Sequence, residues 1–562
     1  MKETCHTRRI FSPVVLGLLF LCIFHLNSSV VNAAPFNTTV PVVVDPRYEI
    51  QILVPGSHFH GIHGLAFDSQ DNLYAGSVVG QAIYSVNTNT GDVMEFISPP
   101  KGTADDLEFG PDGRIYYTSY VEGKLRCKGA DGKVTVLAEG LPGINSLAFN
   151  NEGRLFVTQV FLGDALYEID LSGQKKTRKI AEKLGGLNGF DFGPDNMLYG
   201  PLWFKGAVGK VDVETGNVEV VAKGFKIPAA VNFDSKGNLY AVDTATGEVV
   251  QVDIKTGQKK VIAKVDPSID NLAIDSKDRI FITNMAKNGI YEIDKKTGKS
   301  RTIVEGKLSC AAGVAVSTEG DSDTVYITDV FSVKKVDGFT GEVTTMKSSH
   351  AQGSHIAYPI TISVYKGNLL LTSPVTGTVQ GIDSKTNQSK SMFAGFKAPG
   401  HALMMDDGSV IVAEMGTGNL LRVKGKEGKD RTVIAKGLIT PGYLSRAGEN
   451  AVYITEIVAG TISRIDLSNG KKEVIAKGLK VPKGMGVLPD GKLVVVETGA
   501  AKLVQIDPDS GATTTLVNNL AVGYPLGGPP PGALVTGVAV SDSGVIYVTG
   551  DIENVLYKIR LK

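Results

Sequence analysis

The sequence lacks several features that would point directly to a partner or a cofactor. Its 58 basic and 58 acidic side chains cancel, so no net field favours a nucleic acid, an anionic membrane or a polyionic substrate. Cysteine occurs four times in 562 residues, and after residue 33 only Cys127 and Cys310 remain, far apart and without zinc-ligand spacing. Neither a disulfide framework nor a zinc site is therefore indicated.

The motifs of several common enzyme classes are also missing. No glycine-rich nucleotide-binding loop stands between a strand and a helix, and neither a GxSxG nucleophile elbow nor an HExxH zinc motif occurs. A phosphate-binding fold, a serine hydrolase of the α/β type and a zincin are accordingly not indicated.

Long hydrophobic runs are absent except at the start of the chain. A basic N-terminus is followed by the apolar run Val14–Phe24 and by small residues around Ala33, which is the layout of a secretory signal. An uncleaved anchor is the alternative, although the run is short for a bilayer span. We expect residues 1–33 to be a signal peptide and 34–47 a linker, so that the mature protein is secreted or periplasmic with no membrane span.

What the chain does contain is a repeat. "GLAFDSQDNLYAGS" and "DLEFGPDGRIYYTS" each show a short apolar strand, a turn of Asp, Asn or Gly, and a second apolar strand; a third strand such as "LYEIDLSG" and a fourth usually follow. Four strands recurring about every 41 residues are typical of a β-propeller blade. Twelve such units start with residues 64–77, 106–119, 146–159, 189–202, 230–243, 271–284, 313–329, 361–373, 402–414, 443–456, 484–497 and 537–550.

The number of units predicts two rings rather than one. Propellers usually hold 4–8 blades, so twelve four-stranded blades favour two six-bladed β-propellers in tandem and an all-β fold class. The strand "YEIQILV" (48–54) stands before the first unit, and "RTIVEG" (301–306) can be read as its counterpart in the second half. With each ring closed by such a strand, the propellers would span residues 48–296 and 297–562.

Residues at the starts of innermost strands converge at one mouth of a propeller's central channel. In the first half, four of the six equivalent positions carry Asp or Asn, whose oxygens suit Ca²⁺, with Mg²⁺ or Mn²⁺ as alternatives. Asn and Asp also favour loop-to-strand turns, but the second half shows no such enrichment, so turn chemistry alone does not explain them. The six positions are His63, Asp105, Asn145, Asn188, Ala229 and Asp270; their counterparts are Ala312, Tyr358, Gly400, Gly442, Lys483 and Thr536.

The motifs "LNGFDFGPDNMLYG", "DDLEFGPDGRIYYTS" and "INSLAFNNEGRLFVT" resemble those of the senescence marker protein/gluconolactonase (regucalcin-like) family across residues 48–296. The stretch "HGLAF" is similar to one in paraoxonases. These relatives are six-bladed, bind an axial divalent cation and in many cases hydrolyse lactones or esters. The resemblance implies Asn145, Asn188 and Asp270 as metal ligands, and Asp105 fits the same role.

One departure concerns the residue on the first inner strand. Regucalcin-like enzymes place a glutamate there, whereas this chain has His63. The arrangement then resembles that of paraoxonases, in which a histidine near the metal serves as general base on water. His63 is therefore a candidate catalytic residue, and a histidine merely packed into the channel wall is the alternative.

Two further histidines precede this strand. His58 and His60 alternate with Phe59, so they could face the mouth as a base and its orienter, and His60 is a second catalytic candidate. No carboxylate stands at a spacing that would orient either ring, so solvated loop residues are the alternative.

The second half has a weaker constellation. Its second strands end in a partly acidic set, and His401 stands 13 residues before Glu414. A His and Glu in that relation resemble the streptogramin lyases, which use them with Mg²⁺ for elimination, although a charge-lined channel is the alternative. The set is Asp329, Ser373, Glu414, Glu456, Glu497 and Gly550.

These observations lead to an exported, divalent-metal-dependent hydrolase of a lactone or related ester, with the second propeller as lid, substrate platform or surface for a protein or glycan. The alternatives are a binding or scaffold propeller of the NHL-repeat kind with a structural metal, and a lyase. Because propellers host all three, the fold does not decide between them.

Overall fold

The computed structural model describes residues 39–562, except 175, 355 and 525–535. The expected signal peptide (1–33) and the first part of the expected linker lie outside the described residues. Within the described ranges, no helix is long and apolar enough to cross a membrane.

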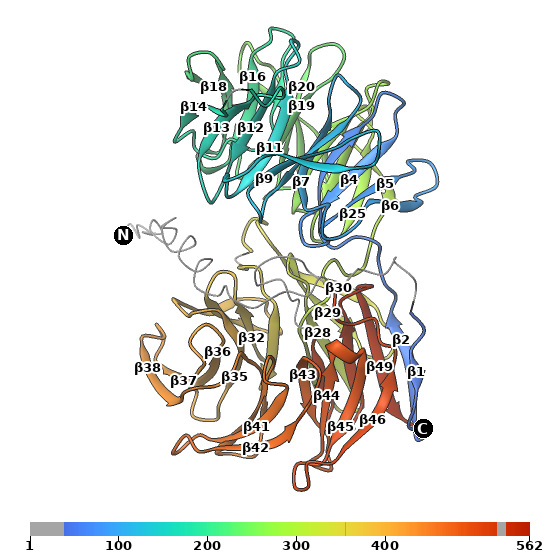
Figure 1. The fold of residues 1–562 in the computed structure, drawn as a ribbon, viewed down its shortest axis with the longest axis vertical. Coiled ribbons are helices and arrows are strands. Elements are labelled where there is room, and N and C mark those ends of the chain that lie inside the picture. The colour runs from blue at the N-terminus through green and yellow to red at the C-terminus, as the bar shows by residue number, and fades with distance from the viewer. Residues whose placement is uncertain (1–38, 175, 355, 525–535) are drawn as a thin grey trace.

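The described chain is almost entirely β-structure, arranged in twelve antiparallel sheets. Eleven sheets have four strands, and the twelfth has five because β1 (Val42–Val43) pairs with the outer strand of that blade. The repeated turn explains the hairpins: in the turn after Phe233, the Asp234 carboxylate accepts the backbone N–H groups of Lys236 and Asn238. The predicted all-β fold with two six-bladed propellers is confirmed (Figure 1).

The first propeller comprises β3 (Ile62–Phe67), β4 (Leu73–Ser77), β5 (Ala82–Val86), β6 (Val93–Ile97), β7 (Ala104–Phe109), β8 (Ile115–Ser119), β9 (Lys124–Lys128), β10 (Val134–Ala138), β11 (Ile144–Phe149), β12 (Leu155–Gln159), β13 (Ala165–Ile169), β14 (Arg178–Glu182), β15 (Asp191–Phe192), β16 (Leu198–Leu202), β17 (Ala207–Val211), β18 (Val218–Lys223), β19 (Pro228–Phe233), β20 (Leu239–Asp243), β21 (Glu248–Val252), β22 (Lys259–Lys264), β23 (Ile269–Ile274), β24 (Ile280–Asn284), β25 (Gly289–Ile293) and β26 (Ser300–Val304), with the 3₁₀ turn η1 (Trp203–Lys205).

The second propeller comprises β2 (Tyr48–Val54), β27 (Val314–Glu319), β28 (Ser322–Thr328), β29 (Ser332–Asp337), β30 (Val343–Ser348), β31 (Thr361–Tyr365), β32 (Asn368–Ser373), β33 (Thr378–Asp383), β34 (Ser389–Ala394), β35 (Pro399–Met404), β36 (Val410–Glu414), β37 (Asn419–Lys424), β38 (Asp430–Ala435), β39 (Pro441–Arg446), β40 (Ala451–Glu456), β41 (Thr461–Asp466), β42 (Lys472–Lys477), β43 (Pro482–Val487), β44 (Leu493–Glu497), β45 (Lys502–Ile506), β46 (Thr513–Asn518), β47 (Val538–Val540), β48 (Ile546–Gly550) and β49 (Val555–Leu561), with the 3₁₀ turn η2 (Thr498–Ala500).

The innermost strands close each ring. In the first propeller, β3, β7, β11, β15, β19 and β23 contact one another in that order, and β23 returns to β3. In the second, β27, β31, β35, β39, β43 and β47 do the same, and β47 returns to β27. Apolar side chains between successive sheets, such as Ile62, Leu73 and Phe281 between the first and sixth blades, form the core.

The predicted closure of the rings is wrong. β2 pairs with β49, from Tyr48 opposite Leu561 to Val54 opposite Leu556, so this strand completes the last blade of the second propeller and not the first. The strand read as its counterpart, β26, is the outer strand of the sixth blade of the first propeller. The first propeller therefore spans residues 62–304 and is inserted between β2 and β27, and the predicted boundary at 296/297 falls inside its last blade.

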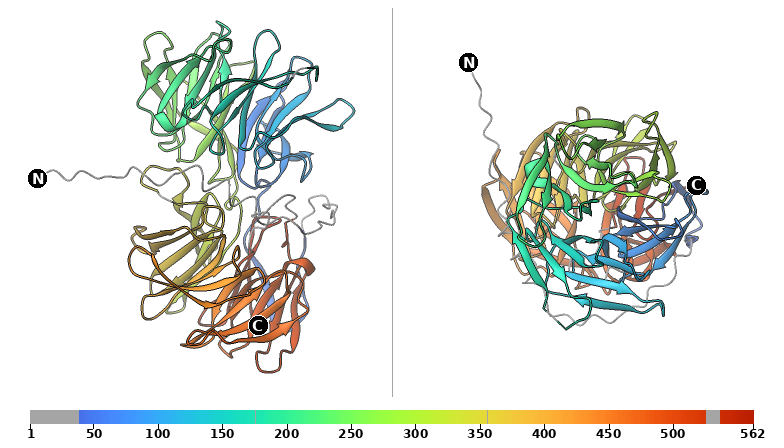
Figure 2. Two further views of the ribbon diagram at one scale, coloured as in Figure 1. Left: turned by 60° about the vertical axis from the view of Figure 1, so that its left-hand side comes forward. Right: turned by 90° about the horizontal axis from the view of Figure 1, so that it is seen from above.

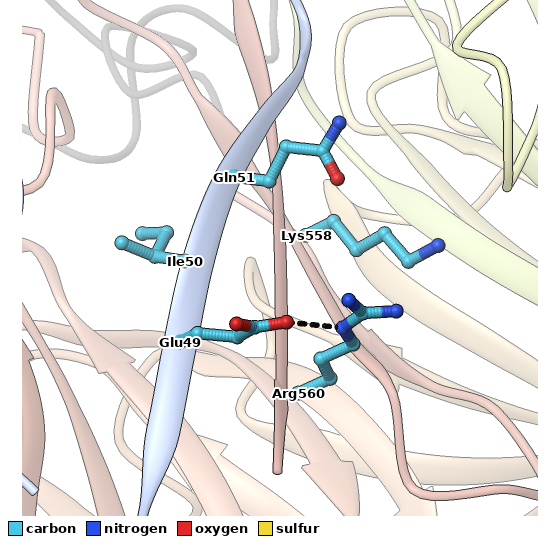
Figure 3. Close-up of a pocket in the computed structure, with 5 residues that line it drawn as sticks. All are labelled: Glu49, Ile50, Gln51, Lys558 and Arg560. Atoms are coloured by element: carbon cyan, nitrogen blue, oxygen red, sulfur yellow. Dashed lines mark hydrogen bonds and ion pairs between the residues drawn. The ribbon is translucent and has the colours of Figure 1, made fainter. Parts of the chain in front are cut away.

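The pairing of β2 with β49 can be followed in Figures 1 and 3. β2, drawn blue, lies beside the red β49 in the lower propeller (Figure 1). On the outer edge of the pair, Glu49, Ile50, Gln51, Lys558 and Arg560 line a shallow pocket, where the Glu49 carboxylate accepts a hydrogen bond from Arg560 (Figure 3). This pocket lies on the outside of a blade and away from both channel mouths.

The two propellers lie one above the other, with loops of each at the junction between them (Figure 2). Loops between second and third strands of the first propeller contact the second: Gly80 O accepts from the Tyr524 hydroxyl, Ala245 O from the Gln352 N–H, and Ala286 O from Lys334. Such loops lie on the same face as the starts of the innermost strands. The mouth of the first propeller therefore faces the second propeller and not open solvent.

Candidate functional site

The predicted axial residues do lie together at the mouth of the first propeller. His63, Asp105, Asn145 and Asp270 stand in the first two positions of β3, β7, β11 and β23, and Asn188 stands three residues before β15. Hydrogen bonds join several neighbours of this set. His63 Nδ1 lies 3.0 Å from Asp270 Oδ2, Asn145 Nδ2 donates to Asp105 Oδ2 at 2.5 Å, and the Ser146 hydroxyl contacts Asn145 Oδ1 at 3.0 Å and Asn188 Oδ1 at 3.3 Å.

The His63 imidazole is held between two carboxylates. Its Nδ1 is 3.0 Å from Asp270 and 3.6 Å from Asp105 Oδ1, and only 9% of the residue is exposed. Its Nε2 is buried and has no hydrogen-bond partner. Because Nδ1 donates its proton to a carboxylate, the neutral ring carries its lone pair on Nε2, which is the arrangement of an oriented general base.

Burial and neighbouring charges shift the pKa values of His63 and Asp105 at the mouth. Burial disfavours the charged form of His63, but the hydrogen bond to Asp270 and the charges of Asp270 and Asp105 outweigh it and raise the His63 pKa above its ordinary value. Burial also raises the pKa of Asp105 to about 8, although His63 opposes the shift. The net effect of burial and the neighbouring charges at the mouth is therefore to raise the pKa values of both His63 and Asp105 above their ordinary values.

Some of the oxygen atoms at the mouth are of the kinds that bind a hard divalent cation. Two carboxylates and the amide oxygens of Asn145 and Asn188 are the ligand types that Ca²⁺ takes. Within the part of the chain that the structure describes, no group of three or more His, Cys, Asp or Glu side chains is spaced to hold a metal ion. Any cation here must therefore draw on the asparagine oxygens as well as on Asp105 and Asp270.

The channel below the mouth contains buried acids that the sequence pattern did not single out. Asp106 accepts a hydrogen bond from the Asn271 amide across the channel, and burial raises the pKa of Asp106 to about 7. Deeper, burial raises the pKa of Glu108 well above its usual range, and the charge of Asp191 adds to the shift. Asp106 and Glu108 follow Asp105 by one and three positions, and Asp191 follows Asn188 by three. The repeat register alone could therefore have located these acids.

The structure separates His60 from this cluster. His60 is 1% exposed, its Nε2 lies 2.8 Å from Asp551 O in the second propeller, and its ring lies 4.3 Å from that of Tyr524. His58 is exposed and lines a different pocket with Ser57 and Asn288. His60 thus serves the contact between the propellers, and neither histidine contacts His63 in the way that a base and its orienter would.

Residues of the second propeller cover the mouth. The Phe331 ring, on the loop between β28 and β29, lies 5.3 Å from the His63 ring, and a Cβ on Gly61 would come within 2.1 Å of it. His350 and Tyr358, on the loop between β30 and β31, share a hydrogen bond of 2.7 Å. From the sequence, Tyr358 was predicted only as an axial position of the second propeller. Its place beside Phe331, which contacts His63 of the first propeller, depends on how the two propellers are stacked.

The acidic set of the second propeller has a structural role. The Asp329 carboxylate accepts the backbone N–H groups of Ser309 and Cys310, and Glu414 accepts that of Lys397. Each carboxylate thus fixes the loop that leads into the adjacent innermost strand, and Asp243 does the same in the first propeller. Glu456 and Glu497 likewise accept the N–H groups of Ile439 and Lys480.

His401 is also engaged in packing. Its ring stacks on Tyr443 with centroids 4.0 Å apart, its Nε2 lies 3.1 Å from Ile362 O, and its Nδ1 accepts from the Leu444 N–H at 3.4 Å. Neither His401 nor Glu414 has a free nitrogen or oxygen of the kind that acid–base chemistry needs. The geometry gives the elimination reaction no support at this pair.

The buried histidines predict a loss of stability in acid. Burial lowers the pKa values of His60 and His401 from 6.5 to about 4. Below pH 6.5 the unfolded chain takes up protons that the folded chain does not, so stability should fall as the pH drops from about 6.5 to 4, by up to roughly 3 kcal/mol for each histidine. Urea unfolding at pH 7 and pH 4.5 measures this loss.

His401→Phe isolates one histidine in that experiment. Phenylalanine keeps the stack on Tyr443 but cannot be protonated, so the variant should start less stable and lose less between the two pH values than the wild type. Equal losses in both proteins would contradict the assignment of His401 as a buried neutral ring.

Comparison with known proteins supports the resemblance for part of the chain. Residues 197–331 match the family model of the SMP-30/Gluconolactonase/LRE-like region, and no curated protein matches. This match covers the last three strands of the fourth blade, the fifth and sixth blades of the first propeller, and the first two strands of the next ring. Of the predicted site residues it contains Asp270 alone.

Three solved structures similar to this chain have low sequence identities and TM-scores below 0.5. A virginiamycin B lyase from Staphylococcus aureus is 14% identical over 50% of this chain and 95% of its own, with a TM-score of 0.37. A gluconolactonase from Xanthomonas campestris is 17% identical over 45% and 96%, with a TM-score of 0.36. The extracellular domain of BT4673 from B. thetaiotaomicron is 10% identical over 91% and 82%, with a TM-score of 0.31. Similarities of this size transfer no activity.

Proposed function

We propose that the protein is an exported, divalent-metal-dependent hydrolase of a lactone or related ester, acting at the mouth of the first propeller. The observation that carries the proposal is the Asp270–His63 pair, in which one ring nitrogen contacts a carboxylate and the other is buried without a partner. A histidine held in this way is suited to take a proton from water.

The chain's own residues would divide the work of ester hydrolysis. Asp270 holds the His63 ring with Nε2 toward the attacking water, and it stabilises the imidazolium that forms when the ring accepts the proton. Asn145 and Ser146 position Asp105 and Asn188 through the hydrogen bonds described above. The second propeller limits the access of bulk water, since Phe331 packs against His63.

Asp105, Asp270, Asn145 and Asn188 are the residues that would hold the cation. When bound, Ca²⁺ supplies Lewis-acid polarisation of the substrate carbonyl. The acidic residues suit this role because no lysine or arginine pairs with Asp105 or Asp270 among the ion pairs of the described residues.

Chelation followed by readdition of metal tests the proposal. The mature protein is treated with chelator, and hydrolysis of γ-butyrolactone, a δ-lactone and phenyl acetate is measured before and after Ca²⁺ is restored. We expect Ca²⁺ to restore activity to the wild type and not to Asn188→Ala. Asn72→Ala, an exposed turn residue of the first blade, is the matched control and should behave as the wild type.

Two outcomes would count against the hydrolase. Turnover that survives complete chelation would remove the metal from the reaction. No turnover on the panel, together with a melting temperature that rises when Ca²⁺ is added, would instead indicate a binding propeller with a structural cation.

A further inference from the structure

A loop of the second propeller is fastened onto the mouth of the first. The loop between β30 and β31 starts at Ser349, whose carbonyl accepts a hydrogen bond of 2.5 Å from the Ser268 hydroxyl of the first propeller. Three residues later, the Gln352 N–H donates to Ala245 O at 2.9 Å. Two anchors on neighbouring blades hold the intervening His350 in a defined place above the first ring.

Ring contacts place Tyr358 of this loop beside the axial cluster, because Tyr358 contacts Phe331 and Phe331 contacts His63. Burial raises the pKa of Tyr358, and the charges of Asp270 and Asp105 add to that shift. The pKa of His350 is lowered to about 4 by burial, and Asp270 and His63 both act on it. These electrostatic effects agree with the ring contacts, because Phe331 packs against His63 at 5.3 Å and against Tyr358 at 6.2 Å.

The pair is joined to the surface by further aromatic rings. The ring centroid of Trp203 lies 5.2 Å from that of His350, with the two rings nearly perpendicular, and the Phe161 centroid lies 5.4 Å from that of Trp203 and 5.7 Å from that of Phe204. Phe204 is 57% exposed. An unbroken series of ring contacts thus runs from solvent to the axial cluster, with residues from both propellers in it.

We propose that His350 and Tyr358 are part of the site and contact the substrate, so that the site is built from both propellers. With its proton on Nε2, the neutral His350 ring donates a hydrogen bond to the Tyr358 hydroxyl oxygen and holds it in place. The hydroxyl then donates its own proton in a hydrogen bond to an oxygen of the ester or lactone while His63 acts on water. The flat rings beside it bind the apolar carbon skeleton of the substrate. This inference deepens the proposed hydrolase and rests on it.

Tyr358→Phe tests the role of the hydroxyl. Phenylalanine keeps the ring against Phe331 and removes the hydroxyl together with its hydrogen bond to His350. The protein should therefore stay folded with a modestly lower melting temperature, while kcat/KM for a hydrolysed lactone should fall at least tenfold. The control is Tyr365→Phe at the opposite end of β31, whose hydroxyl bonds to Asp406 on the far face. It should leave kcat/KM unchanged.

Trp203 provides a readout of binding that is independent of turnover. It is the single tryptophan of the chain, and its ring contacts His350. Titration with γ-butyrolactone or phenyl acetate should change its fluorescence in a saturable way, with a weaker apparent affinity in Tyr358→Phe and the wild-type affinity in Tyr365→Phe.

The outcomes separate this inference from the proposed function. Turnover by the wild type with equal kcat/KM and equal Trp203 titrations in Tyr358→Phe would overturn the shared site and leave the hydrolase standing. Saturable Trp203 titration that weakens in Tyr358→Phe, without turnover, would overturn the hydrolase and support a shared binding site. Neither turnover nor a fluorescence change with any probe would overturn both.

Discussion

His63→Gln should slow hydrolysis severely while leaving the fold intact. Glutamine can still donate a hydrogen bond to Asp270, so the mouth keeps its geometry, but it cannot accept a proton from water near neutral pH. Removal of a general base costs typically 10²–10⁴-fold, and we expect kcat/KM to fall within that range. Initial rates on the lactone panel, with the melting temperature and Ca²⁺ affinity measured in parallel, check the prediction.

His60→Gln is the matched control for this variant. His60 is as deeply buried as His63 but contacts Asp551 and Tyr524 at the junction of the propellers. Its replacement should lower stability without the specific loss of kcat/KM. A His63→Gln protein that hydrolyses esters at the wild-type rate would show that the base lies elsewhere, and a loss of Ca²⁺ affinity would show that His63 acts on the cation and not on water.

The repeat made most of the fold predictable, because strand and turn signals recur in every blade. The second strands are short apolar runs such as Leu155–Gln159 and Leu493–Glu497, and the turn carboxylates accept backbone N–H groups within the same hairpin, as at Asp234. The axial register was predictable for the same reason, since equivalent positions in a repeat occupy equivalent places around the channel. His63, Asp105 and Asp270 are therefore brought together as expected.

What the repeat could not predict depends on contacts between units. The strand Tyr48–Val54 has the composition of an outer strand, and nothing local distinguishes a place in one ring from a place in the other. His350 lies outside the repeating strands, so its contact with Trp203 follows only from the stacking of the rings. Likewise, the sequence predicted, as an alternative, an acid–base site from carboxylates such as Asp329 and Glu414. In the structure, these carboxylates accept backbone N–H groups of neighbouring loops.

Removal of β2 should unfold the second propeller and spare the first. β2 supplies the outer strand of the last blade, and it buries Leu53 and Val54 almost completely, at 6% and 0% exposure. Burial of these two side chains contributes roughly 3–6 kcal/mol, which is comparable with the whole stability of a typical domain at about 5–15 kcal/mol. A chain that begins at residue 56 should therefore lose hydrogen-exchange protection in β47–β49 before β3–β26.

The register between β2 and β49 allows an experiment that tests which propeller β2 completes. Tyr48 lies opposite Leu561, and the Lys562 N–H donates to Arg47 O, so the two strands would form a hairpin if they were joined there. Moving residues 47–55 to the C-terminus behind a two-residue Asn-Gly turn should restore protection in β47–β49, because the same strand then returns to the same place. Placing the segment directly before residue 56 in a chain that ends at residue 306 should add no stability to the first propeller, whose six blades are complete without it. A gain there, together with no rescue at the C-terminus, would mean that the strand closes the first ring after all.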